Sequence, residues 1–112
     1  MAFGQSIFRG DNFRTNVSVV ERIRREVAEP RGVAVSQVAL AWVLGHPVIS
    51  TALVGARTPA EVDANDVGAE LDLTAGERAT IDAILAGVAG RVREFTPLRP
   101  AMEPWGEEIP AR

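Results

Sequence analysis

The spacing of apolar residues predicts a helix over 16–29. Apolar side chains recur there at intervals of three and four, as one face of a helix requires. The positions on this face are Val20, Ile23 and Val27. Asn16 is a suitable N-cap residue, and Pro30 followed by Gly32 ends the pattern. Residues 1–15 show no sustained period, so we expect a loop there.

Two further helices are expected over 59–68 and 74–88. Each follows a capping pattern, in which a threonine precedes a glutamate by three residues. The pairs are Thr58 with Glu61 and Thr74 with Glu77. The inward face of the later helix consists of Ile81, Ile84, Leu85 and Val88. The earlier helix is weakly apolar and is expected at the surface. The prolines after residue 89 predict a tail that is extended or disordered.

Between these segments, the chain is apolar in two different ways. Residues 38–44 are apolar on every side and predict a buried helix over 36–45, with Ser36 as its N-cap. Residues 48–54 are rich in β-branched side chains and almost continuously apolar, the pattern of a strand covered on both faces. A single strand cannot satisfy its own backbone hydrogen bonds, so the pattern indicates part of a larger sheet protein.

Composition excludes several kinds of chemistry. The 112 residues allow one domain, and they include no Cys, no Lys and no Tyr. Disulfides, thiolate catalysis, Schiff-base lysines and phenolic acids are therefore excluded, and no metal site is expected. The net charge of −3 argues against a nucleic-acid surface. The sequence shows neither a membrane span nor a secretory signal, so we expect a cytoplasmic protein.

The candidate site lies at the end of the predicted strand. Gly55 and Ala56 form a small-residue turn, Arg57 follows, and Thr58 caps the next helix. A glycine turn, a guanidinium and a helix N-terminus together have the geometry of an anion site. The alternative is that Arg57 is an exposed residue at a strand end, and that Thr58 and Glu61 only cap the helix.

Several segments resemble the C-terminal end of the aldo-keto reductase family. The matching residues are Gln37-Val38-Ala39-Leu40-Ala41-Trp42-Val43-Leu44, Leu53-Val54-Gly55-Ala56-Arg57-Thr58-Pro59, Val62, Asn65 and the Leu-Asp-Leu-Thr segment at 71–74. The resemblance covers residues 12–105, and the length and spacing of the motif make it specific. It implies the last strand of a (β/α)8 barrel with its flanking helices, and it implies that the rest of the barrel would lie before Met1.

The resemblance also implies roles for the candidate site. The segment would bind the adenosine 2′-phosphate end of NADP(H), with Arg57 and Thr58 on the phosphate and Asn65 on the adenine. Gly55 and Ala56 would let the backbone approach the cofactor. Two positions depart from the family pattern. Glu61 stands where Gln is frequent, so its carboxylate could repel the phosphate or pair with Arg57. Ala64 stands where many members carry a Glu that helps to hold the adenine.

The predicted fold class is therefore α/β, the C-terminal part of a (β/α)8 TIM barrel that is mostly helical as an isolated chain. Residues 1–112 would form one partial barrel domain, with a loop at 1–15, helices and the last strand at 16–88, and a tail at 89–112. In the full-length context, the implied partners are NADP(H), a small carbonyl substrate and the missing N-terminal part of the barrel, with no nucleic acid and no membrane.

Two functions from different classes follow. The first is an NADP-dependent oxidoreductase segment that binds the cofactor but lacks the catalytic Tyr and Lys of the family. The second is a small helical interaction or DNA-binding module, since 32–37 and the next short helix have helix-turn-helix spacing. A recognition helix needs a polar outer face, however, and 38–44 offers none.

Overall fold

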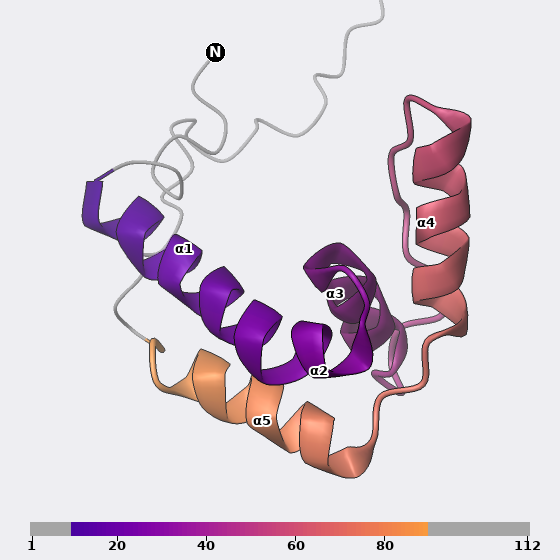
Figure 1. Ribbon diagram of the computed structural model, residues 1–112. Coiled ribbons are helices and arrows are strands. Elements are labelled where there is room, and N and C mark those ends of the chain that lie inside the picture. Colours follow the sequence, from indigo (N-terminus) through magenta and orange to yellow (C-terminus); the bar gives the residue numbers. More distant parts are fainter. Residues whose placement is uncertain (1–9, 90–112) are drawn as a thin grey trace, which may run out of the picture.

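The computed structural model describes residues 10–89, and all regular structure within this range is helical (Figure 1). The elements are α1 (Gly10–Ile23), η1 (Arg24–Ala28), α2 (Glu29–Arg31), α3 (Val35–Leu44), α4 (Pro59–Glu70) and α5 (Ala75–Ala86). The loop predicted for 1–9 and the tail predicted from 90 onward lie outside the described residues. Among the helices of 10–89, none combines the length and apolar character needed to cross a lipid bilayer.

The first helix is longer than predicted. α1, η1 and α2 follow one another without a break from Gly10 to Arg31, so the loop expected for 10–15 is wrong. The expected stop at Gly32 is confirmed, since its φ of 66° places it in the left-handed region, but Pro30 does not end the helix, which continues past it. The turns of η1 are wider, with Glu29 N–H donating to the Arg24 carbonyl. A wider turn accommodates a proline ring, which clashes with the preceding carbonyls of a regular helix.

One continuous core joins the first helix to α3 and α5. Its fully buried members are Val27, Ala28, Val38, Ala41, Leu73 and Ile81. The predicted inward residues Val27, Ile81 and Ile84 are each at most 2% exposed. Val20 was predicted to point inward but is 45% exposed, and Val19 is buried in its place. Ile23 and Val27 lie on the inward side as predicted, so the difference is confined to the first half of the helix, where α1 packs against α5.

The helix α3 differs from its prediction at its start and in its burial. Ala34, not Ser36, is the N-cap, and its N–H donates to Oε1 of Gln37 at 2.9 Å. Val38 and Ala41 are buried, but Ala39 is exposed. The prediction of burial on every side is therefore wrong for this chain. Within 10–89, η1 and α4 pack against α3, and α5 joins it through the shared core and the bond from Trp42 to Asp82, while other positions of α3 stay exposed.

The strand predicted for 48–54 is absent from the structure of 10–89. The segment has no regular structure, and its side chains are largely in solvent, with Leu53 97% and Val48 86% exposed. A strand needs a neighbour that takes its backbone hydrogen bonds, and the described residues supply none. The segment is not helical either. It links α3 to α4 and runs back alongside α4 (Figure 1).

The approach of α4 to α3 is unusually close at Gly68. This glycine is buried in α4, and a Cβ atom placed on it would lie 3.1 Å from Cα of Gln37 and 3.2 Å from Cδ2 of Leu40. One turn earlier, Nε2 of Gln37 donates to the backbone carbonyl of Ala64 at 3.1 Å. These contacts fix the helix that carries the candidate site.

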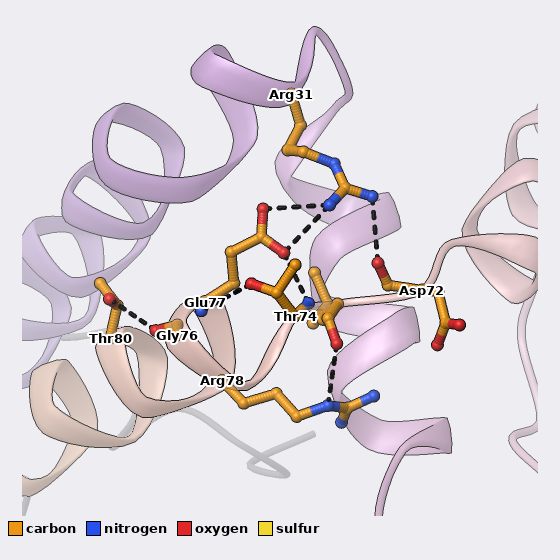
Figure 2. A network of polar contacts seen from close by, with 8 residues as sticks. Arg31, Asp72, Thr74, Gly76, Glu77, Arg78 and Thr80 are labelled. Carbon is orange, nitrogen blue, oxygen red and sulfur yellow. Dashed lines mark hydrogen bonds and ion pairs between the residues drawn. The ribbon is translucent and has the colours of Figure 1, made fainter.

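A polar network joins the end of the first helix to the start of α5 (Figure 2). The predicted capping box is confirmed: Thr74 N–H donates to Oε2 of Glu77 at 2.8 Å, and Glu77 N–H donates to Oγ1 of Thr74 at 3.2 Å. The guanidinium of Arg31 contacts both oxygens of Glu77, at 3.1 and 3.2 Å, and donates to the Asp72 carbonyl at 3.0 Å. The Thr74 N–H and then the Arg31 charge hold the pKa of Glu77 below its ordinary value.

We predict that Gly68→Ala lowers the free energy of unfolding by about 1 kcal/mol. Overpacking costs about 1–3 kcal/mol, and the better helix propensity of alanine recovers about 1 kcal/mol of it. Gly76→Ala in α5 is the matched control, because its Cβ would lie 3.9 Å from the nearest atom, Oγ1 of Thr74. The control should stabilise by about 0.5–1 kcal/mol. Urea unfolding measures both, and equal stabilisation by the two substitutions would refute the close contact.

We also predict that Glu77→Gln destabilises the chain by about 1 kcal/mol at neutral pH. Glutamine keeps a capping oxygen but loses the charge that Arg31 faces. Because the pKa of Glu77 is lowered in the folded state, its contribution is present above the ordinary carboxyl value of 4.5 and is lost as the pH falls.

Urea unfolding between pH 7 and pH 3 tests this. The difference in the free energy of unfolding between the wild type and Glu77→Gln should vanish toward pH 3. As a control, Glu70→Gln, at an exposed residue of α4, should change the free energy of unfolding little. A gap that stays constant with pH would mean that the charge of Glu77 contributes nothing.

Candidate functional site

The six residues predicted for the site lie together at the N-terminal end of α4. They are Gly55, Ala56, Arg57, Thr58, Glu61 and Asn65. Four hydrogen bonds connect the turn before the helix with its first two turns. These local hydrogen bonds hold together the six residues, which the sequence motif places within eleven positions.

Thr58 is the N-cap of α4, as predicted. Its backbone is extended, with φ −133° and ψ 155°, and its Oγ1 accepts from the N–H of Glu61 at 3.2 Å. Pro59 occupies the first helical position, where its missing N–H costs nothing. The reciprocal half of the capping box differs from the prediction, because the carboxylate of Glu61 reaches one residue further back.

Glu61 binds Arg57 through two different donors. The backbone N–H of Arg57 donates to Oε2 of Glu61 at 2.6 Å, and Nη2 of Arg57 lies 3.4 Å from Oε1. The sequence left open whether this carboxylate repels an anion or pairs with Arg57, and the structure shows the pair. The Arg57 side chain is still 91% exposed, and that of Glu61 is 41% exposed. Solvent weakens an ion pair of this kind.

Asn65 ties the turn to the second turn of the helix. Its Nδ2 donates to the carbonyl of Gly55 at 3.3 Å. Gly55 and Ala56 are exposed, and a Cβ atom on Gly55 would meet no atom within 4 Å. The backbone of the turn is thus open to solvent, and an amide side chain holds its position.

The donor set suits a phosphate group. It combines a guanidinium, a threonine hydroxyl and the positive end of a helix dipole, which together favour anions. The carboxylate of Glu61 is the one feature of the six that opposes an anion. The residues present therefore fit a phosphate group, with the competing charge of Glu61 already among them.

Two aromatic side chains, Trp42 and His46, meet at the C-terminal end of α3. Trp42 is half-buried beside the core, and its Nε1 donates to Oδ1 of Asp82 at 3.0 Å. His46 lies in the turn after α3, and its ring meets that of Trp42 edge-on, with centroids 4.7 Å apart. Within 10–89, no three His, Asp or Glu side chains gather where they could hold a metal ion.

Sequence reasoning missed the contribution of Gln37 to the site. Its amide caps α3 through Oε1 and supports α4 through Nε2. The position of Gln37 three residues after Ala34 was a signal for the capping contact. Its contact with Ala64 joins residues 27 positions apart, and no local pattern encodes it.

The comparison with protein families finds one match. The profile of the aldo/keto reductase family matches residues 8–86, which is well over half of the chain and includes every residue of the candidate site. A search of curated proteins and a search of solved structures found no match.

We predict that Thr58→Ala frays the first turn of α4. Loss of an N-cap hydroxyl costs about 1 kcal/mol, which is roughly a fivefold change in a local opening equilibrium. The amide proton of Glu61 should therefore exchange with solvent about fivefold faster, as NMR can measure. Thr58→Ser is the control, since serine keeps the acceptor oxygen. Equal exchange in the alanine and serine variants would contradict the capping role.

Proposed function

The chain belongs to the aldo/keto reductase family, and from this premise we propose that it carries the part of an NADP(H)-dependent oxidoreductase that binds the adenosine 2′-phosphate end of the cofactor. One observation carries the proposal. The side chain of Arg57 is 91% exposed directly before the N-cap of α4, so a phosphate can reach it from solvent.

In this proposal each residue of the turn has a binding role. Arg57 contacts two phosphate oxygens with its planar fork, and the Thr58 hydroxyl adds a donor to a third. The exposed backbone of Gly55 and Ala56 lets the ribose approach, and Asn65 contacts the adenine. When bound, the cofactor supplies the hydride for carbonyl reduction. The residues of this chain bind and orient its far end.

We also propose that 48–54 becomes the last strand of a (β/α)8 barrel when its neighbours are present. In support, the segment is not helical, and it exposes large apolar side chains, with Leu53 at 97% and Val54 at 54%. Neighbouring strands would cover these side chains and take up the backbone hydrogen bonds. The preceding part of the barrel is thus the proposed partner.

The reaction itself would depend on that partner. In this proposal the proton donor and its lysine come from the preceding strands, since the sequence contains no Tyr and no Lys. The substrate is a small carbonyl compound, and we propose a cytoplasmic location. An interaction or DNA-binding module gains no support, because α3 packs against α4 and η1 instead of presenting a polar face.

We predict that Arg57→Ala weakens NADPH binding about tenfold and leaves NADH binding nearly unchanged. A charged hydrogen bond contributes roughly 1.5–3 kcal/mol, or about 10- to 150-fold in affinity. The lower end applies because Arg57 is so exposed and is already paired with Glu61. Calorimetric titration of the 112-residue chain with each cofactor is the measurement.

Arg14→Ala is the matched control, because this arginine of α1 is 84% exposed and its loss changes the net charge equally. It should leave both affinities unchanged. Equal losses for NADPH and NADH in Arg57→Ala would show that Arg57 is only structural, and no NADPH binding by the unaltered chain would refute the proposed cofactor site in this chain.

A further inference from the structure

The carboxylate of Glu61 already pairs with Arg57, whose guanidinium a 2′-phosphate would use in the proposed function. Oε2 accepts the backbone N–H of Arg57 at 2.6 Å, and Oε1 lies 3.4 Å from its guanidinium. The N–H of Glu61 itself is held by Oγ1 of Thr58 at 3.2 Å, so the start of the Glu61 side chain is fixed on this side of the helix. An incoming phosphate therefore meets a negative charge next to its arginine.

The rest of α4 strengthens this effect. Pro59–Glu70 contains no basic residue, and it carries four carboxylates: Glu61, Asp63, Asp66 and Glu70. Within 47–77, Arg57 is the only basic residue of the sequence. At physiological salt, charges interact over about 8 Å, so Glu61 and the nearest of these carboxylates act on a phosphate dianion bound at Arg57.

A carboxylate at this place has a second capability. In dinucleotide sites, an acidic side chain accepts a hydrogen bond from the ribose 2′-hydroxyl of NAD, whereas an arginine accommodates the 2′-phosphate of NADP. Arg57 and Glu61 bring both kinds of group to one helix turn, within 3.4 Å of each other. A ribose with a 2′-phosphate thus matches Arg57 and is repelled by Glu61. A ribose with a 2′-hydroxyl matches Glu61 and has no charge to pair with Arg57.

We propose that Glu61 determines cofactor selection at this site: it accepts the 2′-hydroxyl of NADH and opposes the 2′-phosphate of NADPH, so that the site takes both cofactors. This inference rests on the proposed function, because it assumes that the adenosine end of a nicotinamide dinucleotide binds at Arg57. Glu61 is a specificity-determining residue in this scheme, and it has no part in the chemical step.

The test uses two probes that differ only in the 2′-phosphate, adenosine 2′,5′-bisphosphate and adenosine 5′-monophosphate. The full 112-residue chain is titrated with each by calorimetry, as wild type and as Glu61→Gln. Removal of one exposed charge changes affinity roughly two- to fivefold. Glu61→Gln should tighten the bisphosphate and weaken the monophosphate, so the ratio of their dissociation constants should shift by about 4- to 25-fold.

Glu70→Gln is the matched control. It makes the same change of charge and shape on the same helix, about 14 Å further along at 1.5 Å per residue. It should change both dissociation constants less than twofold. If the ratio of the two dissociation constants is the same in Glu61→Gln as in Glu70→Gln, the proposed role of Glu61 is overturned. Binding of the bisphosphate by the wild type would still support the proposed function. Failure of every protein to bind either probe overturns both.

A measurement on the unaltered chain makes the test independent of how Glu61→Gln folds. The bisphosphate would bring its 2′-phosphate charge beside the carboxylate that accepts the Arg57 N–H, so the NMR signal of that amide should shift strongly. The monophosphate brings no charge to this position, so the shift should be small. Equal shifts with both probes would overturn the proposal.

Discussion

The close contact between α3 and α4 holds the candidate site in place. α4 packs on α3 through a buried glycine, Gly68, and the amide of Gln37 bonds to the α4 backbone at Ala64. Every residue of the site lies at the start of this helix or in the turn before it. A Cβ atom at Gly68 would press the two helices apart, because the nearest facing atom, Cα of Gln37, belongs to the backbone.

The second constraint is electrostatic and lies within the site. Arg57 is followed in sequence by four carboxylates of α4, and the nearest of them, Glu61, accepts its backbone N–H and also pairs with its guanidinium. A helix N-terminus with an exposed arginine attracts anions, and at the start of α4 the carboxylate of Glu61 already occupies that role. In the cofactor site that we propose, the balance between the two charges, rather than the presence of either, would govern which adenosine ribose is preferred.

Three helices carry a Glu or Gln three residues after the N-cap, and each of these side chains makes different contacts. Glu77 completes its capping box and also pairs with Arg31, which ties the first helix to α5. Gln37 caps α3 and supports α4. Glu61 reaches past its N-cap to Arg57. A Glu or Gln three residues after an N-cap thus links two helices, supports a neighbouring helix or forms part of the candidate site, depending on which residues lie within its reach.

The sequence by itself determined the local features: the caps at Thr58 and Thr74, the helices that follow them, and the family motif that places the site. Each depends on residues within one or two turns, so neighbouring positions suffice. Only the tertiary structure decided the buried face of α1, the missing strand at 48–54 and the pairing of Glu61 with Arg57. Burial and strand pairing require surfaces distant in sequence, and a rotamer that joins two charges depends on the backbone that presents them.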